Sequence, residues 1–212
     1  MLLIRTLLLT LLVAGFTGAT SPAQATSIET SLQPFTGDPV SVRVVLDDDA
    51  GDGSIRVTAE VAGDIVADLR GLFLDIKDDT LLSGLRVAGD DVTGVSFTGS
   101  VINLGQGSNL NGGGSPCPCD LGVEIGAPGI GKDDIHTTTF SIAHETDALT
   151  LALFRQELVG VRVTSVGLSD GYGAGSREGS SKLVGVIPEP ATALLVVYGL
   201  IGLAAWRRRP AG

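Results

Sequence analysis

Residues 40–62 read VSVRVVLDDDAGDGSIRVTAEVA, and their apolar side chains fall at every second position on both sides of an Asp/Gly-rich centre. The apolar positions are Val40, Val42, Val44 and Leu46 before the centre, and Ile55, Val57, Ala59 and Val61 after it. A period of two is typical of a strand with one buried face, and Asp and Gly favour tight turns. The stretch therefore predicts two antiparallel strands joined as a hairpin.

Similar short strands follow along the chain, separated by Gly- and Asp-rich turns. We expect them at residues 69–76, 94–99, 121–126, 135–143, 149–154, 158–166 and 182–186. Residues 145–158 have a second interpretation as one helix, because Thr146 or Asp147 is a suitable N-cap. Many short strands at regular spacing predict an all-β fold, an antiparallel β-sandwich-like ectodomain over residues 26–186.

The charge of the chain is concentrated in this middle region. All 24 Asp and Glu lie between Glu29 and Glu189, where only ten Lys and Arg accompany them, which leaves a net charge of −14. A surface of that sign repels nucleic acid, so we expect no nucleic-acid partner. Divalent cations and basic partners are compatible with it.

The first 25 residues have the three parts of a secretory signal peptide. Arg5 supplies the positive charge, residues 7–13 supply the apolar stretch, and Ala23-Gln24-Ala25 supplies a small-x-small cleavage site. We expect cleavage after Ala25 by the general secretion machinery. The protein is thus predicted to be exported.

The last 26 residues, 187–212, form a second signal. Pro188-Glu189-Pro190 precedes an uncharged span over residues 191–206, and Arg207, Arg208 and Arg209 follow it. As a helix the span would extend about 24 Å, close to the roughly 30 Å hydrocarbon core, and arginines stay on the cytoplasmic side. We predict a single C-terminal transmembrane helix, with the ectodomain outside.

This tail resembles that of the PEP-CTERM exported proteins. The resemblance covers about 25 residues and rests on three unlike features in the same order: Pro188-Glu189-Pro190, the apolar span and the arginine cluster. It implies sorting by exosortase, a membrane-embedded cysteine transpeptidase that cuts near Pro-Glu-Pro. It also implies transient anchoring in the inner membrane, followed by release to the cell surface or exopolysaccharide matrix of a Gram-negative bacterium.

The ectodomain offers no recognisable catalytic motif. It lacks G-x-S-x-G and H-E-x-x-H, and GAPGIGKD at residues 126–133 has Asp133 where a P-loop needs Ser or Thr. We expect a non-enzymatic structural or adhesive protein of the surface or matrix. The alternative is a carbohydrate-binding module, with calcium-assisted sugar binding as one form of it. Tyr172 is the one Tyr or Trp of the predicted ectodomain that could stack on a sugar, which counts against this alternative.

Two further groups are candidate ligands or cross-links. Asp47, Asp48, Asp49 and Asp52 are candidate calcium ligands in the hairpin turn, although the EF-hand spacing is absent; the alternative is a solvated turn and no cofactor. Cys117 and Cys119, in an exported chain, are candidates for a disulfide, within the chain or between chains, or for free thiols. Metal binding would require His136 and His144 to complete a ligand set.

Overall fold

The computed structural model describes residues 26–48, 50–114, 117–129, 133–168 and 177–189. The predicted signal peptide, Asp49, Pro190, the predicted transmembrane span and Arg207 to Arg209 lie outside these residues. Within the described part of the chain, no helix is long and apolar enough to cross a membrane.

The described residues form twelve strands and two short 3-10 turns. The strands are β1 (Ser27–Gly37), β2 (Ser41–Asp47), β3 (Ile55–Ala62), β4 (Ile65–Leu74), β5 (Leu85–Ala88), β6 (Val92–Ser96), β7 (Asn103–Gly105), β8 (Ser108–Asn109), β9 (Leu121–Ile125), β10 (Thr137–His144), β11 (Leu158–Leu168) and β12 (Gly179–Val186). The turns are η1 (Asp79–Gly84) and η2 (Leu151–Leu153). The prediction of a mostly β, antiparallel fold is confirmed.

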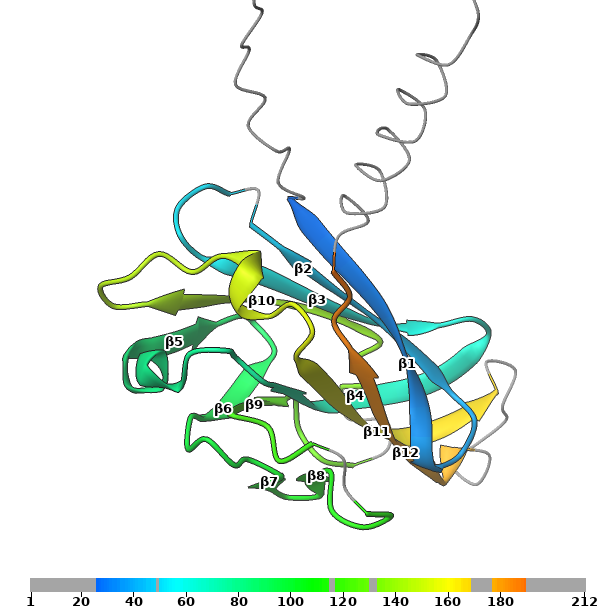
Figure 1. Cartoon of the computed structure of the whole chain (residues 1–212). Helices are drawn as coiled ribbons and strands as arrows, with labels where there is room; N and C mark the ends of the chain where they lie inside the picture. Colours follow the sequence, from blue (N-terminus) through cyan, green and yellow to red (C-terminus); the bar gives the residue numbers. More distant parts are fainter. Residues whose placement is uncertain (1–25, 49, 115–116, 130–132, 169–176, 190–212) are drawn as a thin grey trace, which may run out of the picture.

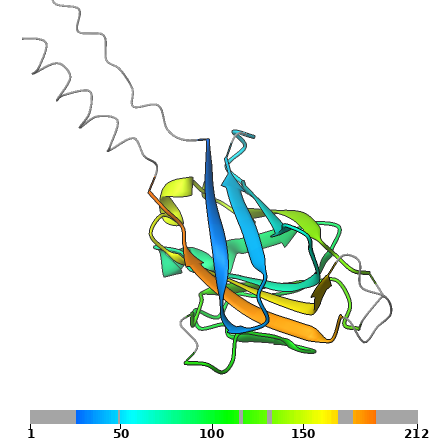
Figure 2. The ribbon, with the colours of Figure 1, turned by 90° about the vertical axis from the view of Figure 1, so that its right-hand side faces the viewer.

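Ten of these strands form one antiparallel sheet that almost closes on itself (Figures 1 and 2). Their order is β5-β10-β3-β2-β1-β12-β11-β4-β9-β6. The two edge strands, β5 and β6, are consecutive in the chain and are joined by a turn in which Val92 N donates to Gly89 O at 3.2 Å. The sheet therefore encloses its core, and its edges lie close together.

Strand β1 connects the two halves of the sheet. Its first part, through Leu32, pairs with β2, and its second part, from Gln33, pairs with β12. The pairing with β12 shifts between Pro34 and Thr36. Proline has no N–H to donate to a ladder, which explains an irregularity at this point and lets the strand change direction.

The interior is built from the alternating positions that the sequence indicates. Val42, Val44 and Leu46 of β2 are fully buried, as are Ile55 and Val57 of β3. β2 and β3 pair in register over their whole length, so residues 40–62 form the predicted hairpin.

A further layer covers the outer face of β4, β9 and β11. This covering segment (residues 97–114 and 117–120) contains β7 and β8 and packs a second apolar cluster against the sheet. The buried members of that cluster are Phe73, Val101, Leu110, Cys117 and Cys119. Because both faces of β9 are covered, all five of its residues are buried.

Glycines on the outer face allow this close approach. A Cβ at Gly122 of β9 would lie 2.9 Å from Leu104 Cδ2 and from Val101 Cγ1, and one at Gly160 of β11 would overlap Leu110 Cδ1. A side chain at either position would push the covering segment away from the sheet.

The strand predicted at residues 149–154 is wrong, and so is the alternative helix at 145–158. This segment instead makes the single 3-10 turn η2. Leu149, Leu151 and Phe154 all insert into the core, and Leu149 N donates to Gly53 O at 2.8 Å. The three residues are two and then three positions apart, a spacing that fits neither a strand nor a regular helix. The backbone forms a 3-10 turn because this conformation buries all three side chains.

The described chain begins and ends at the same end of the sheet. Thr30 Oγ1 near the start of β1 donates to Val186 O at the end of β12, at 3.1 Å. At the opposite end, Asp38 N donates to Ser180 O at 3.1 Å, where β1 stops and β12 begins. In Figure 1, β7 and β8 lie toward this opposite end, which we call the distal end.

Candidate functional site

Two adjoining pockets at the distal end form the candidate site, which we call the basic groove. The larger, about 320 Å³, is lined by Thr36, Gly37, Asn111, Gly112, Arg162, Ser180 and Lys182. The smaller, about 230 Å³, has Arg70, Gln106, Thr164, Arg177 and Ser180 among its lining residues. Ser180 lines both pockets, so the two are adjacent. Four basic side chains of an otherwise acidic chain gather here, together with the acidic Glu178.

Arg162 and Lys182 are the centre of the larger pocket. They are directly opposite each other in the register of β11 and β12, so both side chains lie on the outer face. Arg162 Nε donates to Gly107 O and its Nη1 donates to Ser181 O, both at 3.2 Å, while Lys182 Nζ donates to Asn111 O. Among the described residues neither cation has an acidic partner.

The environment of this pair lowers the pKa of both groups. Burial lowers the pKa of Arg162. Burial, followed by the positive charge of Arg162, lowers the pKa of Lys182. Both effects show that the charged forms are disfavoured where no anion is present.

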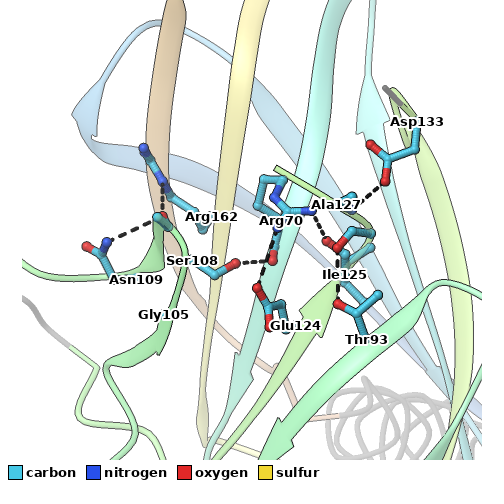
Figure 3. Close-up of polar contacts among 12 residues, drawn as sticks. Arg70, Thr93, Gly105, Ser108, Asn109, Glu124, Ile125, Ala127, Asp133 and Arg162 are labelled. Atoms are coloured by element: carbon cyan, nitrogen blue, oxygen red, sulfur yellow. Dashed lines mark hydrogen bonds and ion pairs between the residues drawn. The ribbon is translucent and has the colours of Figure 1, made fainter. Parts of the chain in front are cut away.

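Arg70 lies in the smaller pocket and is almost completely buried, at 1% exposure. It occupies a bulge of β4, because Val163 pairs with Leu69 while Arg162 pairs with Gly71. Its Nη1 donates to Ile125 O, and its Nη2 lies 3.5 Å from Glu124 Oε1 (Figure 3). The last two atoms form an ion pair but make no hydrogen bond. Glu124 thus neutralises the charge of Arg70 without satisfying all of its donors.

The covering segment is attached to the sheet beside Arg70. Ser108 Oγ donates to the carbonyl oxygen of Arg70, and Arg162 and Asn109 both donate to Gly107 O (Figure 3). Hydrogen bonds to backbone oxygens therefore join the covering segment to β4 and β11, beside the basic groove.

Arg177 is also neutralised. Its two terminal nitrogens donate to the two carboxylate oxygens of Asp134 at 2.7 and 2.9 Å, a bidentate pair, and this raises the pKa of Arg177. Its Nε donates to Ser165 O at 3.2 Å. Ser165 and Asp134 have φ of 53° and 43°, a conformation that non-glycine residues seldom adopt. The hydrogen bonds to these two residues hold Arg177 at the pocket.

Asp68 is a buried carboxyl next to this site. Ile135 N donates to its Oδ1 at 3.1 Å, and its Oδ2 makes no hydrogen bond. Burial raises its pKa to about 6, with Asp133 and Asp134 adding repulsion. The group is therefore less charged at neutral pH than an ordinary aspartate.

Three of the four candidate calcium ligands, Asp47, Asp48 and Asp52, lie in the described chain. Asp52 Oδ1 accepts hydrogen bonds from the N and Oγ of Ser54, at 2.9 and 2.6 Å, and these bonds lower its pKa. Asp47 is the last residue of β2, and Asp49 lies outside the described residues. Among the described residues, Asp47, Asp48 and Asp52 belong to no group of the size that holds a metal ion.

Cys117 and Cys119 are joined to each other in a disulfide, and both are fully buried under the covering segment. Asp75 lies within 4.8 Å of their sulfur atoms. A disulfide has no thiolate to offer a metal, so in this state the three residues are not a ligand set. Burial raises the pKa of Asp75 to about 6.

The two histidines lie apart from the cysteines and from each other. His144 ends β10, and its Nδ1 accepts from Thr146 N at 3.3 Å and from Asp147 N at 3.1 Å. His136 precedes β10, and its carbonyl accepts from Val61 N. Neither completes a metal site with Cys117 and Cys119.

Only the beginning of the predicted sorting motif lies in the described chain. Pro188 and Glu189 follow β12 and are exposed, so this part of the motif is accessible. Ala23, Ala25, Pro190 and the arginine cluster fall outside the described residues.

Sequence analysis missed the basic groove. The alternation in VGVRVTS puts Arg162 on the polar face of its strand, and this signal was available. That Lys182 lies opposite it depends on the register between β11 and β12, which the local sequence does not contain.

Comparison with known families finds no family model that matches the chain, and comparisons with curated proteins and with solved structures find no significant match. The function must therefore be argued from the residues and the geometry.

Proposed function

We propose that this chain is an exported, non-enzymatic protein with a β-sandwich-like ectodomain and a structural or adhesive role at the surface or in the extracellular matrix of a Gram-negative bacterium. A signal peptide directs it to the secretion machinery. The Pro-Glu-Pro tail and its membrane helix hold it in the inner membrane until exosortase cuts it.

The position of the chain ends carries this proposal. The ectodomain is entered at β1 and left at β12 from one end of the sheet, where Thr30 contacts Val186. The basic groove includes Thr36 and Gly37 at the far end of β1 and Lys182 of β12. Lys182 is four positions before Val186, so at about 3.3 Å per residue it lies roughly 13 Å from the end of the sheet at which the chain leaves it. A tether at the C-terminus would therefore place the groove's Gly37 and Ser180 farther from the membrane than Lys182.

The same groove favours the second candidate function, carbohydrate binding. Thr36, Asn111 and Ser180 give it hydroxyl and amide groups, and the pocket of about 320 Å³ is at the lower end of the usual range for ligand sites. These groups can hydrogen-bond to sugar hydroxyls without aromatic stacking, so the small number of Trp and Tyr residues does not exclude sugar binding. Calcium is not required for such contacts.

Cell fractionation with tail variants tests the proposed sorting. Wild-type protein should be recovered from the surface and matrix fraction. Replacing Arg207, Arg208 and Arg209 by Gln should reduce this fraction. The positive charges that stop translocation are then lost, so the tail is no longer held in the membrane where exosortase would cut it. Replacing the same residues by Lys preserves the charge and serves as the matched control.

Replacement of Pro188, Glu189 and Pro190 by Ala should instead leave the protein in the inner membrane, because the cleavage motif is gone. Surface recovery that is unchanged in both the Gln and the Ala variants would contradict sorting by the tail.

A further inference from the structure

Arg162 and Lys182 form a like-charged pair whose hydrogen bonds to the covering segment do not balance their charge. Like charges directly opposite on neighbouring strands destabilise a sheet. Among the residues that the structure describes, both cations donate only to carbonyl oxygens, and burial lowers the pKa of both. Arg43, by contrast, lies between Glu29 and Glu60 on the other half of the sheet, at 2.6 and 3.6 Å.

This unbalanced charge lies inside a pocket rather than on an open surface. The pocket of about 320 Å³ has Arg162 and Lys182 in its lining, together with Thr36, Asn111 and Ser180. One anionic group placed between the two cations would remove their repulsion and accept charge-assisted hydrogen bonds from both. The structure thus leaves space for an anion where an anion is needed.

The ligand must also satisfy the neutral part of the lining. The hydroxyls of Thr36 and Ser180 and the amide of Asn111 match an alcohol-rich molecule. The adjacent pocket, which Arg70, Arg177 and Glu178 line, extends the site. A simple inorganic anion would use little of this surface. A densely charged polymer such as nucleic acid is disfavoured by the net charge of −14 that residues 29–189 carry.

We propose that the pocket between Arg162 and Lys182 binds the carboxylate of a uronic-acid residue in a sparsely charged polysaccharide. The carboxylate lies between the two cations, and the hydroxyls of the sugar contact Thr36, Asn111 and Ser180. The adjoining pocket receives the next sugar unit, which is neutral, because Arg70 and Arg177 there already have acidic partners.

This inference rests on the proposed function in one respect: it names the ligand through which a matrix protein would adhere. The two can nevertheless fail separately. Fractionation tests whether the chain reaches the surface, and binding by the purified protein tests the pocket alone.

Binding is measured by isothermal titration calorimetry with the full chain purified in a neutral detergent, at low ionic strength. The probe is a disaccharide of glucuronic acid linked to glucose, and the matched neutral probe is glucose linked to glucose in the same way. Sodium sulfate is a third arm. We expect the acidic disaccharide to bind at least tenfold more tightly than either of the others, and its affinity to fall with added salt.

Variants localise the site. Lys182→Gln and Arg162→Gln should each weaken the acidic disaccharide at least tenfold. Lys77→Gln is the matched control, since it removes an equal charge from an exposed lysine outside the groove. Thermal melting reports whether each variant is folded. In unliganded Lys182→Gln the removed repulsion offsets the lost hydrogen bond from Lys182 Nζ to Asn111 O, so we expect a melting temperature close to that of wild type.

Three results would overturn the proposal. Equal binding of the neutral disaccharide would show that the carboxylate is not recognised. Sulfate binding as tightly as the acidic disaccharide would reduce the site to a general anion site. Full affinity in a folded Lys182→Gln variant would place the ligand elsewhere, and if that variant does not fold, the three arms on wild-type protein still decide.

Discussion

At the scale of single residues, Asp68 makes stability depend on pH. Burial raises its pKa from 3.8 to about 6, so the folded state binds a proton more readily than the unfolded state does. Its contribution to the free energy of unfolding is complete below about pH 3.8 and is lost as the pH rises through about 6. The carboxylate form is therefore the unfavourable one at neutral pH.

Asp68→Asn should raise the free energy of unfolding by about 2 kcal/mol at pH 7.5, because a buried charge is replaced by a neutral group of the same shape. The gain should shrink toward zero near pH 4. Urea denaturation of both proteins across this range measures it. A difference that does not change with pH would contradict the assigned protonation.

The buried ion pair of Arg70 and Glu124 predicts strong coupling. Glu124→Gln leaves the 1%-exposed guanidinium without a counter-charge and should cost about 3 kcal/mol of unfolding free energy. Arg70→Met should cost a similar amount, by leaving the carboxylate unpaired. The double variant should cost less than the sum, and a double-mutant cycle by urea denaturation measures the difference. Additive costs would mean that the two charges do not interact.

At the scale of elements, the covering segment depends on the glycines beneath it. Gly160→Ala adds a methyl group that overlaps Leu110 Cδ1, and should lower the free energy of unfolding by about 2 kcal/mol. In the background of Leu110→Ala the same substitution should cost much less, because the space is then free. Equal costs in both backgrounds, measured by chemical denaturation, would show that the segment does not pack on β11.

Elements also show how far the sequence predicts the fold. The β2–β3 hairpin follows from local alternation and a turn rich in Asp and Gly, and the structure contains it. Strand β1 escaped prediction because only Ile28 and Leu32 of its 11 residues are apolar and buried. It is held by strands on both sides, and this tertiary pairing leaves no periodic signal in its own residues.

The candidate site was harder to predict for a related reason. Arg162 and Lys182 are 20 positions apart, and only the register of β11 with β12 makes them neighbours. Asp47, Asp48 and Asp52, which are close in sequence, form no metal-sized group in the described chain. Closeness in sequence suggested a calcium site at the hairpin turn, whereas the distance in sequence between Arg162 and Lys182 kept the basic groove from being predicted.

At the scale of the whole molecule, the sheet has one end at which the described chain enters and leaves it, and a distal end. Thr30 contacts Val186 at the first end, and the basic groove extends from Lys182 toward Gly37 and Ser180 at the distal end. Under the proposed function, a chain tethered at its C-terminus would present this groove to a matrix polymer, whether or not its tail has been cut.

Mass spectrometry of the mature C-terminus, from host cells with and without an exosortase, tests the central claim most directly. The account predicts a C-terminus near Pro190 when the enzyme is present, and an intact tail including Arg207 to Arg209 when it is absent. An uncut tail in both hosts would contradict it, and would make this protein a permanent membrane protein.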